Sequence, residues 1–390
     1  MKKLLFLLLC LALVSCSVVL ALEDEEDVHF EEIEHLIGQP EEAENGTPDA
    51  ENGNPLPAST PVPQLEADGS TIITITAVGD VTIGRNVQHN GTSIFEKELK
   101  KQKDDINFIF RNVKDIFAED HLTIANFEGV LADEYKIPSN KRNNSYLFLA
   151  PTSYVEALTN NSVEAVTMEN NHAGDFGDEG IASTIATMEE AGIVWSNKGN
   201  MGVYEVQGIK IGMLSYQTLN QPISSEELKH LVDTDIKNAK KTCELVIVSF
   251  HWGDELDYAP KSNQVMLGRA AIDSGADLVL GHHSHRINPI EYYNGKYIVY
   301  SLANCSFAGN NKPSDMYTFI FQTRFKMQHG EIISNSFRII PCRISSRKDY
   351  NDFAITPLTD SSNIKTVLDT LEKNGRKLDY AVTRYPLDWE

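Results

Sequence analysis

The feature that most constrains the fold is a repeated alternation of short β-branched runs with longer amphipathic stretches. Residues 71–78 alternate β-branched and smaller side chains, which is typical of a strand. Further runs of strand length cover residues 122–125, 163–167, 244–250, 277–280 and 296–300. Apolar residues recur at helical spacing over residues 151–160, 178–191 and 260–274. This alternation of strands and helices predicts an α/β domain.

The chain is expected to divide into four parts. Residues 316–344 alternate like antiparallel strands around His329 and are expected to complete the sheets of a single α/β domain. The four parts, in order, are a signal peptide or lipoprotein signal (1–21), an acidic flexible linker rich in Pro and Gly (22–70), the α/β domain (71–345) and a C-terminal extension packed on that domain (346–390).

The first residues predict export. Lys2 and Lys3 precede an apolar run over residues 4–14, which is too short to span a bilayer comfortably and is typical of a signal peptide. Two ends of the signal stay open. Residues 13–16 resemble a lipobox, which would attach lipid to Cys16 and hold the protein at the outer face of the cytoplasmic membrane or in the cell envelope. Residues 19–21 suit ordinary signal peptidase, which would leave a secreted protein.

The charge of the chain is concentrated near its N-terminus. The formal net charge is -22, with 15 Asp or Glu between Glu23 and Asp68 and no Lys or Arg from Leu4 to Gly84. Within this segment, residues 38–69 contain hardly a large apolar side chain, so they bury too little apolar surface to fold and are expected to act as a tether. The negative charge argues against binding to nucleic acid. Because the cysteines after the signal have no CxxC spacing, neither a disulfide framework nor a cysteine-based zinc site is supported.

Polar clusters follow five of the predicted strands, and their shared position predicts a common site. Open α/β sheets bind ligands where several strands end, so loops far apart in the sequence can converge there. Oxygen donors combined with imidazoles suit Mn, Zn or Fe better than Ca, and we expect one or two divalent ions. The clusters cover residues 79–80, 126–128, 170–172, 251–255 and 281–285.

The most specific local signal is His283-x-His285, because two imidazoles at that spacing can project from a tight loop toward a metal. His282 is a weaker candidate. Glu128 follows an apolar strand, where an unpaired carboxylate is costly unless metal, another cation or water compensates its charge. Asp80 could bind or bridge an ion, although Gly-Asp pairs after strands also occur in plain turns.

The remaining cluster residues could take part in the chemistry or support the site, and Asp175 and Glu255 each have two interpretations. Asn171 could donate an oxygen to the metal while His172, uncoordinated, acts as an acid or stabilises negative charge. Asp175 would orient His172, or it would cap the following helix. Glu255 would hydrogen-bond a metal-bound histidine, or it would pair with Lys or Arg. Asn126 is expected to orient its loop.

Taken in order, the segments 79–85, 126–128, 170–177, 251–255 and 281–285 resemble the motifs of the capsule synthesis protein CapA family. The resemblance runs from about residue 72 to residue 307, and Tyr-Ser-Leu-Ala-Asn at 300–304 is similar to the family's closing Tyr-Ser-Leu-Gly-Asn. It implies a calcineurin-like metallophosphoesterase sandwich, in which helices flank two mixed β-sheets. It also implies a part in assembling or exporting a poly-γ-glutamate capsule.

The resemblance implies a role for each matching residue. His172 resembles the catalytic histidine that does not bind metal, with Asp175 beside it, and Asn126, Glu255 and His282 would support the ligands. The metal ligands would be Asp80, Glu128, Asn171, His251, His283 and His285.

The sequence also departs from the pattern it resembles. Phosphoesterases usually carry Asp-x-His at the first strand, whereas this chain has Thr82 in place of that histidine. Ala303 replaces the usual Gly, and Cys305 replaces the usual Phe. The missing imidazole leaves the number of bound metals, and hydrolytic competence with it, open.

Two functional hypotheses therefore stand. The first is a metal-dependent hydrolase that acts on a phosphoryl or amide-type centre of a capsule polymer or a phosphorylated small substrate, with His172 assisting the leaving group. The second is a non-catalytic factor that holds an anionic polymer beside a membrane synthase. In either case Arg85, Lys141 and Arg286 are the local basic candidates for contacts to an anionic partner.

Overall fold

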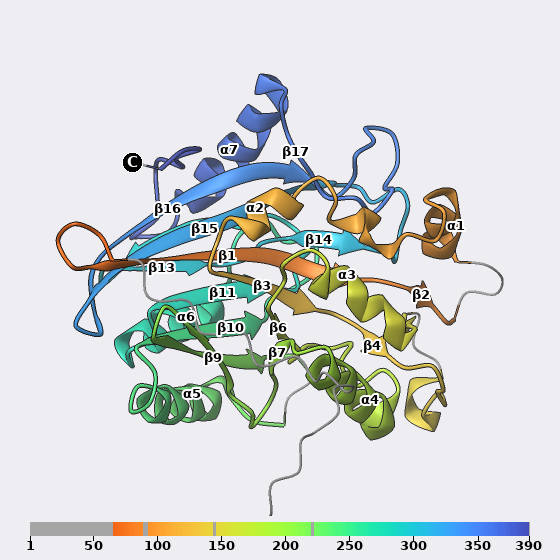
Figure 1. The fold of residues 1–390 in the computed structure, drawn as a ribbon, viewed down its shortest axis with the longest axis horizontal. Helices are drawn as coiled ribbons and strands as arrows, with labels where there is room; N and C mark the ends of the chain where they lie inside the picture. Colours follow the sequence, from red (N-terminus) through yellow and green to blue (C-terminus); the bar gives the residue numbers. More distant parts are fainter. Residues whose placement is uncertain (1–64, 89–92, 143–145, 220–221, 390) are drawn as a thin grey trace, which may run out of the picture. The chain divides into compact units, whose positions relative to one another are not determined.

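The computed structural model describes residues 65–88, 93–142, 146–219 and 222–389 (Figure 1). The predicted signal, Cys16 and most of the acidic linker lie outside these residues. Within the described ranges, no helix has both the length and the apolar character needed to cross a membrane.

The larger of two main sheets has eight strands and contains the N-terminal strand in its middle. Its strand order is β17-β16-β15-β1-β3-β6-β7, and β14 also pairs with β1. β1 is parallel to β3 but antiparallel to β15, so the sheet is mixed. The strands are β1 (Thr71–Thr82), β3 (Leu122–Phe127), β6 (Ala165–Thr167), β7 (Val194–Ser196), β14 (Asn304–Phe307), β15 (Tyr317–Gln328), β16 (Glu331–Arg343) and β17 (Thr356–Pro357).

The second main sheet has six strands in the order β12-β13-β11-β10-β9-β8, and it too is mixed. These strands are β8 (Gly202–Val206), β9 (Ile209–Gln217), β10 (Leu245–His251), β11 (Leu278–His282), β12 (Ile290–Tyr293) and β13 (Lys296–Val299). A small third sheet contains β2 (Arg85–Asn86), β4 (Val130–Leu131) and β5 (Phe148–Ala150).

Helices cover the main sheets. In Figure 1, α5 and α6 lie beside β9 to β11, whereas α7 lies beside β16. α7 also contacts β12 of the other main sheet, and its buried side chains belong to the core between the sheets. The α-helices are α1 (Ile94–Lys101), α2 (Lys114–Ala118), α3 (Glu156–Thr159), α4 (Gly177–Glu190), α5 (Ser225–Ala239), α6 (Ser262–Asp273) and α7 (Ser361–Gly375). Short 3₁₀ turns are η1 (Ile106–Ile109), η2 (Ser139–Lys141) and η3 (Thr152–Val155).

Apolar side chains define the layers. Ile73 and Ile75 of β1 are fully buried in a core that also contains Ile247 and Leu280 of the second sheet, so this core lies between the sheets. A second core joins the larger sheet to α1–α4, and a third joins the smaller main sheet to α5 and α6. The expected α/β fold, a sandwich of two mixed sheets flanked by helices, is therefore confirmed.

Most predicted elements form, but the strands extend further into the polar clusters than the sequence suggested. The strand predicted to stop at Gly79 continues through Asp80 to Thr82, and β11 includes His282. β14 supports this continuation because Asp80 lies opposite Asn304 in the pairing of β1 with β14. A side chain at position 79 could not be accommodated, since its Cβ would lie 2.0 Å from the carbonyl oxygen of Ala303.

Ala303 has a left-handed backbone, with φ 59. Glycine adopts this conformation without steric cost, whereas a Cβ there costs about 1–2 kcal/mol. We expect Ala303→Gly to leave the free energy of unfolding unchanged or to raise it by up to about 1 kcal/mol, because glycine's greater freedom in the unfolded chain offsets part of the gain. Chemical denaturation would measure the change.

A matched control is Ala308→Gly, since Ala308 is buried but is not among the residues with positive φ. It should lower the free energy of unfolding by about 1 kcal/mol through lost packing and added chain freedom. Equal losses in the two variants would contradict the strain assigned to Ala303.

Asp120 makes the free energy of unfolding depend on pH. It lies just before β3, partly buried, and accepts a hydrogen bond of 2.7 Å from the Thr123 hydroxyl. Burial raises its pKa to about 7, and the nearby charge of Glu164 contributes in the same direction. The unfolded chain loses this proton near pH 4, so the free energy of unfolding should fall as pH rises from about 4 to about 7.

Removing the charge of Asp120 should make the free energy of unfolding fall less steeply with pH. Between pH 4.5 and pH 8, the free energy of unfolding of Asp120→Asn should fall by about 1–3 kcal/mol less than that of the native chain. Denaturation at several pH values would measure this difference. Asp349→Asn is the control, because its side chain is 73% exposed. A decline that is the same in all three proteins would rule out Asp120 as its source.

Candidate metal centre

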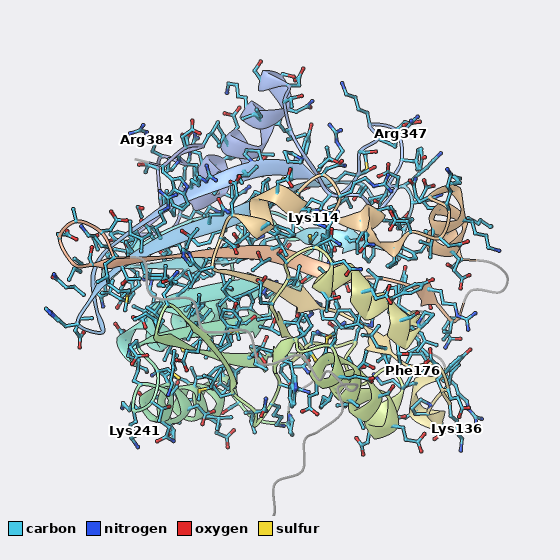
Figure 2. The ribbon with its side chains drawn as sticks, in the orientation of Figure 1. Lys114, Lys136, Phe176, Lys241, Arg347 and Arg384 are labelled. Atoms are coloured by element: carbon cyan, nitrogen blue, oxygen red, sulfur yellow. The ribbon has the colours of Figure 1, made fainter. Side chains whose placement is uncertain are left out.

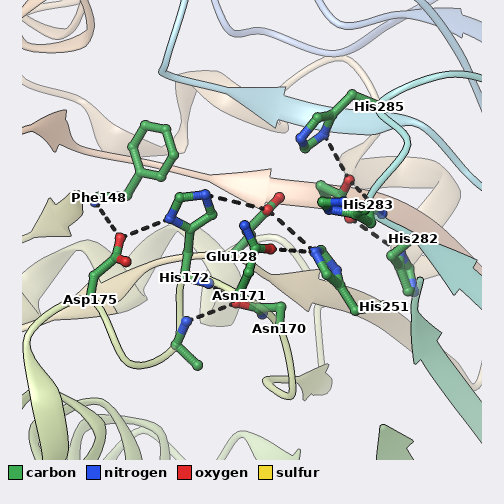
Figure 3. A network of polar contacts seen from close by, with 12 residues as sticks. Glu128, Phe148, Asn170, Asn171, His172, Asp175, His251, His282, His283 and His285 are labelled. Carbon is green, nitrogen blue, oxygen red and sulfur yellow. Dashed lines mark hydrogen bonds and ion pairs between the residues drawn. The ribbon is translucent and has the colours of Figure 1, made fainter. Parts of the chain in front are cut away.

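The polar clusters meet where strands of both main sheets end (Figure 3). The larger sheet contributes Asp80 from β1, and Glu128 directly after β3. The other main sheet contributes His251 at the end of β10, and the loop after β11 contributes His283 and His285. Parallel strands place their carboxyl ends at one edge, which is why segments so distant in sequence converge.

Asp80 is completely buried at the centre of this group. Its Oδ1 accepts a hydrogen bond of 2.8 Å from Asn126 Nδ2, and its Oδ2 lies 3.0 Å from His285 Nδ1. His282 Nδ1 lies 3.4 Å from Oδ1. Although burial opposes ionisation, interactions with His282 and His285 hold the pKa of Asp80 well below its usual range. Asp80 is therefore an ionised carboxylate in the interior.

Glu128 is the residue that most clearly indicates a cation-binding site. It is only 1% exposed, and neither carboxylate oxygen accepts a hydrogen bond from the residues that the structure describes. Oε1 lies 3.6 Å from His251 Nε2 and 4.0 Å from His172 Nε2. Burial, reinforced by the charge of Asp80, raises the pKa of Glu128 to about 7. A buried carboxylate without partners is costly and points to a cation that compensates it.

Two histidines complete a group able to hold that cation. One ligand atom from each of Glu128, His283 and His285 lies within 4.8 Å of the other two. His283 Nδ1 has no hydrogen-bond partner within the described ranges, whereas His285 Nδ1 lies 3.0 Å from Asp80 Oδ2. Both residues have a left-handed backbone, with φ 90 for His283 and 53 for His285, and such strain is concentrated at ligand clamps. The side chains thus suit a divalent ion with mixed oxygen and nitrogen ligands.

The pKa shifts of His283 and His251 agree with this role, whereas that of His285 runs the other way. Burial and the neighbouring His285 lower the pKa of His283 to about 4, and burial with the charge of His283 holds that of His251 well below its usual range. Neutral imidazole is the form that binds metals. Burial opposes charge on His285, but Glu128 and Asp80 outweigh it and raise the pKa of His285 to about 9. A metal that binds His285 would therefore displace a proton from it.

His172 is oriented toward the same centre by Asp175 (Figure 3). His172 Nδ1 lies 2.8 Å from Asp175 Oδ2, which also accepts a hydrogen bond of 2.9 Å from the Phe148 backbone. The ring of Phe148 packs edge-on against His172, with centroids 4.7 Å apart. The helix that follows, α4, has Phe176 as its N-cap, so Asp175 orients His172 and is not the cap.

The two asparagines after β6 have different positions. Asn171 Oδ1 lies 2.6 Å from His251 Nε2, so the structure brings these two predicted ligands together. Asn170, to which the sequence assigned no role, is 2% exposed and donates a hydrogen bond of 2.8 Å to the carbonyl oxygen of Phe127. Its Oδ1 accepts hydrogen bonds from the backbones of His172 and Ala173. The only sequence signal for Asn170 was its place beside Asn171.

The supporting residues are only partly where the sequence placed them. Asn126 and His282 both contact Asp80. Glu255 is exposed, and within the described residues it forms neither the expected hydrogen bond to a histidine nor an ion pair with Lys or Arg. It acts through its charge alone, which contributes to the raised pKa of His285. The next residue, Leu256, has a left-handed backbone with φ 68.

The structure separates the three basic candidates. Arg286 is 5% exposed and donates hydrogen bonds of 2.8 Å to the carbonyl oxygen of His285 and 2.7 Å to Ser314 Oγ, so its role is structural. Arg85 packs over the ring of Tyr135. Lys141 lies beside the residue that orients His172, with Nζ 3.7 Å from Asp175 Oδ1.

Sequence comparisons relate the chain to known proteins. The profile of a family described as "Bacterial capsule synthesis protein PGA_cap" matches residues 74–308. The "PGA biosynthesis protein CapA" of Bacillus subtilis (strain 168) is 28% identical over 262 residues, which cover 63% of this chain and 66% of that protein. The "Capsule biosynthesis protein CapA" of Bacillus anthracis is 28% identical over 255 residues, 60% of each chain. The chain thus spans slightly less than two thirds of these relatives.

Solved structures give more distant likenesses. A hypothetical protein from Thermus thermophilus is 15% identical with a TM-score of 0.41, and the match covers 69% of this chain and 99% of that one. A novel phosphatase from Mycoplasma pneumoniae is also 15% identical, with a TM-score of 0.43 and coverage of 76% and 97%.

Proposed function

The chain belongs to the family of bacterial capsule synthesis proteins, and we propose that it serves the synthesis or export of poly-γ-glutamate or a related capsule polymer through a divalent-metal site. The observation that carries the proposal is the buried carboxylate of Glu128, which accepts no hydrogen bond from the described residues and lies beside His283 and His285. A site built only for stability would neutralise that carboxylate with hydrogen bonds.

We propose Asp80, Glu128, Asn171, His251, His283 and His285 as the ligands of Mn, Zn or Fe, one ion or two. A divalent ion in such a site supplies Lewis-acid chemistry when bound. The chain's own contribution is His172, which directs Nε2 toward Glu128 while Asp175 fixes the other ring nitrogen. A histidine held in this way can give a proton to a leaving group, and the proposed activity is hydrolysis of a phosphoryl or amide-type bond.

A second candidate function is a non-catalytic factor that binds the polymer beside a membrane synthase. The observation that favours it is Thr82, which is fully buried and whose hydroxyl has no hydrogen-bond partner in the described structure. This residue stands where the resembled phosphoesterases carry a metal-binding histidine. A site with one ligand fewer could bind a metal and a polymer without hydrolysing the polymer.

We further propose that the protein is exported and anchored by lipid at Cys16, with the acidic linker as a spacer between membrane and domain. The support is the basic, apolar start of the sequence. Cell fractionation of the native chain and of Cys16→Ser tests this proposal. A native chain recovered only from the medium would favour the secreted form instead.

The function is tested on purified protein by measuring bound Mn, Zn and Fe and then assaying phosphodiester and γ-glutamyl substrates. The native chain should contain about one or two ions per molecule, and His283→Ala should lose metal together with any turnover. Absence of metal from the native chain after incubation with each ion would overturn the site. Metal without turnover of either substrate would favour the polymer-binding factor.

A further inference from the structure

A second candidate site lies beyond the metal centre, in a cavity of about 360 Å³. The cavity lies among the segment that leads into β15, the end of β16 and the first turn of α7. Its polar lining consists of Ser314, Asp315, Tyr317, Arg343, Lys348 and Asn363. We refer to it as the Arg343 pocket.

Arg343 is the last residue of β16 and is partly buried in this pocket. Its guanidinium forms neither a hydrogen bond nor an ion pair with any residue in the described ranges. Such a group presents a fork of N–H donors that matches a carboxylate or phosphoryl group. Lys348, exposed at the rim, is likewise without a hydrogen bond or ion pair within the described part of the chain.

The oxygen atoms in the pocket are already occupied as acceptors. Asp315 accepts hydrogen bonds of 2.9 Å from the Tyr317 backbone and 2.7 Å from the Tyr258 hydroxyl. Asn363 Oδ1 accepts from the Tyr317 hydroxyl at 2.7 Å, and Ser314 Oγ accepts from Arg286 at 2.7 Å.

What remains available to a ligand is therefore a set of donors. The guanidinium of Arg343, the ammonium of Lys348, the amide nitrogen of Asn363 and the hydroxyl hydrogen of Ser314 have no acceptor in the described structure. Two cationic side chains and one engaged carboxylate make the lining net positive, in a chain whose net charge is -22. Donors and positive charge together favour an anion.

The Arg343 pocket is joined to the metal centre through a single side chain. Arg286 donates one hydrogen bond to Ser314 in the pocket and another, of 2.8 Å, to the carbonyl oxygen of His285 in the metal-binding loop. The Arg343 pocket and the metal-binding loop are therefore neighbours that contact the same side chain.

We propose that the Arg343 pocket binds a carboxylate or phosphoryl group of an extended anionic ligand whose reacting part lies at the metal centre. This inference rests on the proposed function for the identity of the ligand, but not for the anion site itself. Arg343 would make the forked contact and Lys348 would strengthen it.

The test measures binding of two probes to the full-length protein by calorimetry, a γ-linked glutamate oligomer and inorganic phosphate. Arg343→Gln should weaken the preferred probe about tenfold or more, which corresponds to the loss of a charge-assisted hydrogen bond. Lys348→Gln, an exposed change that leaves folding intact, should weaken it less. Arg347→Gln is the matched control, because Arg347 is 56% exposed on the same loop and does not line the pocket (Figure 2).

The two probes distinguish the chemistry of the ligand. Preference for the oligomer assigns the pocket to carboxylates, and preference for phosphate assigns it to a phosphoryl group. The inference is overturned if neither probe binds the native chain, or if Arg343→Gln and Lys348→Gln bind as tightly as Arg347→Gln. Thermal melting of each variant establishes that it is folded before binding is compared.

Failure of this inference is separable from failure of the proposed function. In Glu128→Gln, anion binding that persists and still depends on Arg343 supports the pocket even where metal binding is lost. If the native chain binds metal but Arg343→Gln does not change anion binding, the proposal for the Arg343 pocket is wrong and the proposal for the metal site is unaffected.

Discussion

Glu128→Gln is expected to stabilise the metal-free protein and to abolish its response to metal. The buried carboxylate has no hydrogen-bond partner within the described residues, so exchanging it for a neutral amide of the same shape should raise the free energy of unfolding by about 1–3 kcal/mol. With Mn²⁺ or Zn²⁺ at a hundred times the dissociation constant, the native chain should gain about 2.7 kcal/mol and the variant nothing. Denaturation with and without chelator measures both effects.

A second buried glutamate provides the control. Glu98 is 5% exposed but pairs with Lys101 at 2.6 Å and accepts a hydrogen bond from Gln102. Glu98→Gln should therefore lower stability slightly, by up to about 1 kcal/mol, and leave the response to metal intact. If Glu128→Gln behaves like Glu98→Gln in both respects, Glu128 is not a metal ligand.

His172→Ala is expected to separate metal binding from turnover. His172 directs Nε2 toward the centre but lies 4.0 Å from Glu128 Oε1 and is not part of the convergent ligand group. Loss of a positioned proton donor typically lowers turnover about 10²–10⁴-fold, while metal content should stay that of the native chain. Steady-state assays and metal analysis on the same samples would measure the two quantities.

Two further variants make this result interpretable. Asp175→Asn should cause a smaller loss of turnover than His172→Ala, because it leaves the ring in place and weakens only its orientation. His230→Ala should change nothing, since His230 is exposed on α5. Turnover that survives His172→Ala unchanged would remove His172 from the chemistry and strengthen the polymer-binding alternative.

Local patterns in the sequence were sufficient for much of the fold. The segment around His329 forms the hairpin of β15 and β16, and the predicted helix at 178–191 is α4. The strand ends were wrong because pairing with distant segments decides them. Asp80, predicted to lie in a loop, belongs to a strand because β14 pairs beside it.

The candidate site was predictable where the residue type itself carried the signal. A carboxylate after an apolar strand indicated Glu128, and a His-x-His loop indicated His283 and His285. Asn170 and the link from Lys141 to Asp175 were not predictable, because they depend on contacts between loops that only the folded chain defines. Glu255 has a motif position like the others, but it is exposed and forms no hydrogen bond to a histidine among the described residues.

The position of β1 in the middle of the larger sheet sets the order in which the molecule can be completed. Thr71 pairs with Met327, so one edge of the first strand has no partner until most of the chain has emerged. An open edge of β-branched residues is a template for pairing between molecules, and distant pairing of this kind is slow. The chain emerges from the ribosome, or from an export channel, with its N-terminus first. During the interval before β15 has emerged, the unpaired edge of β1 must therefore be protected from pairing with other molecules.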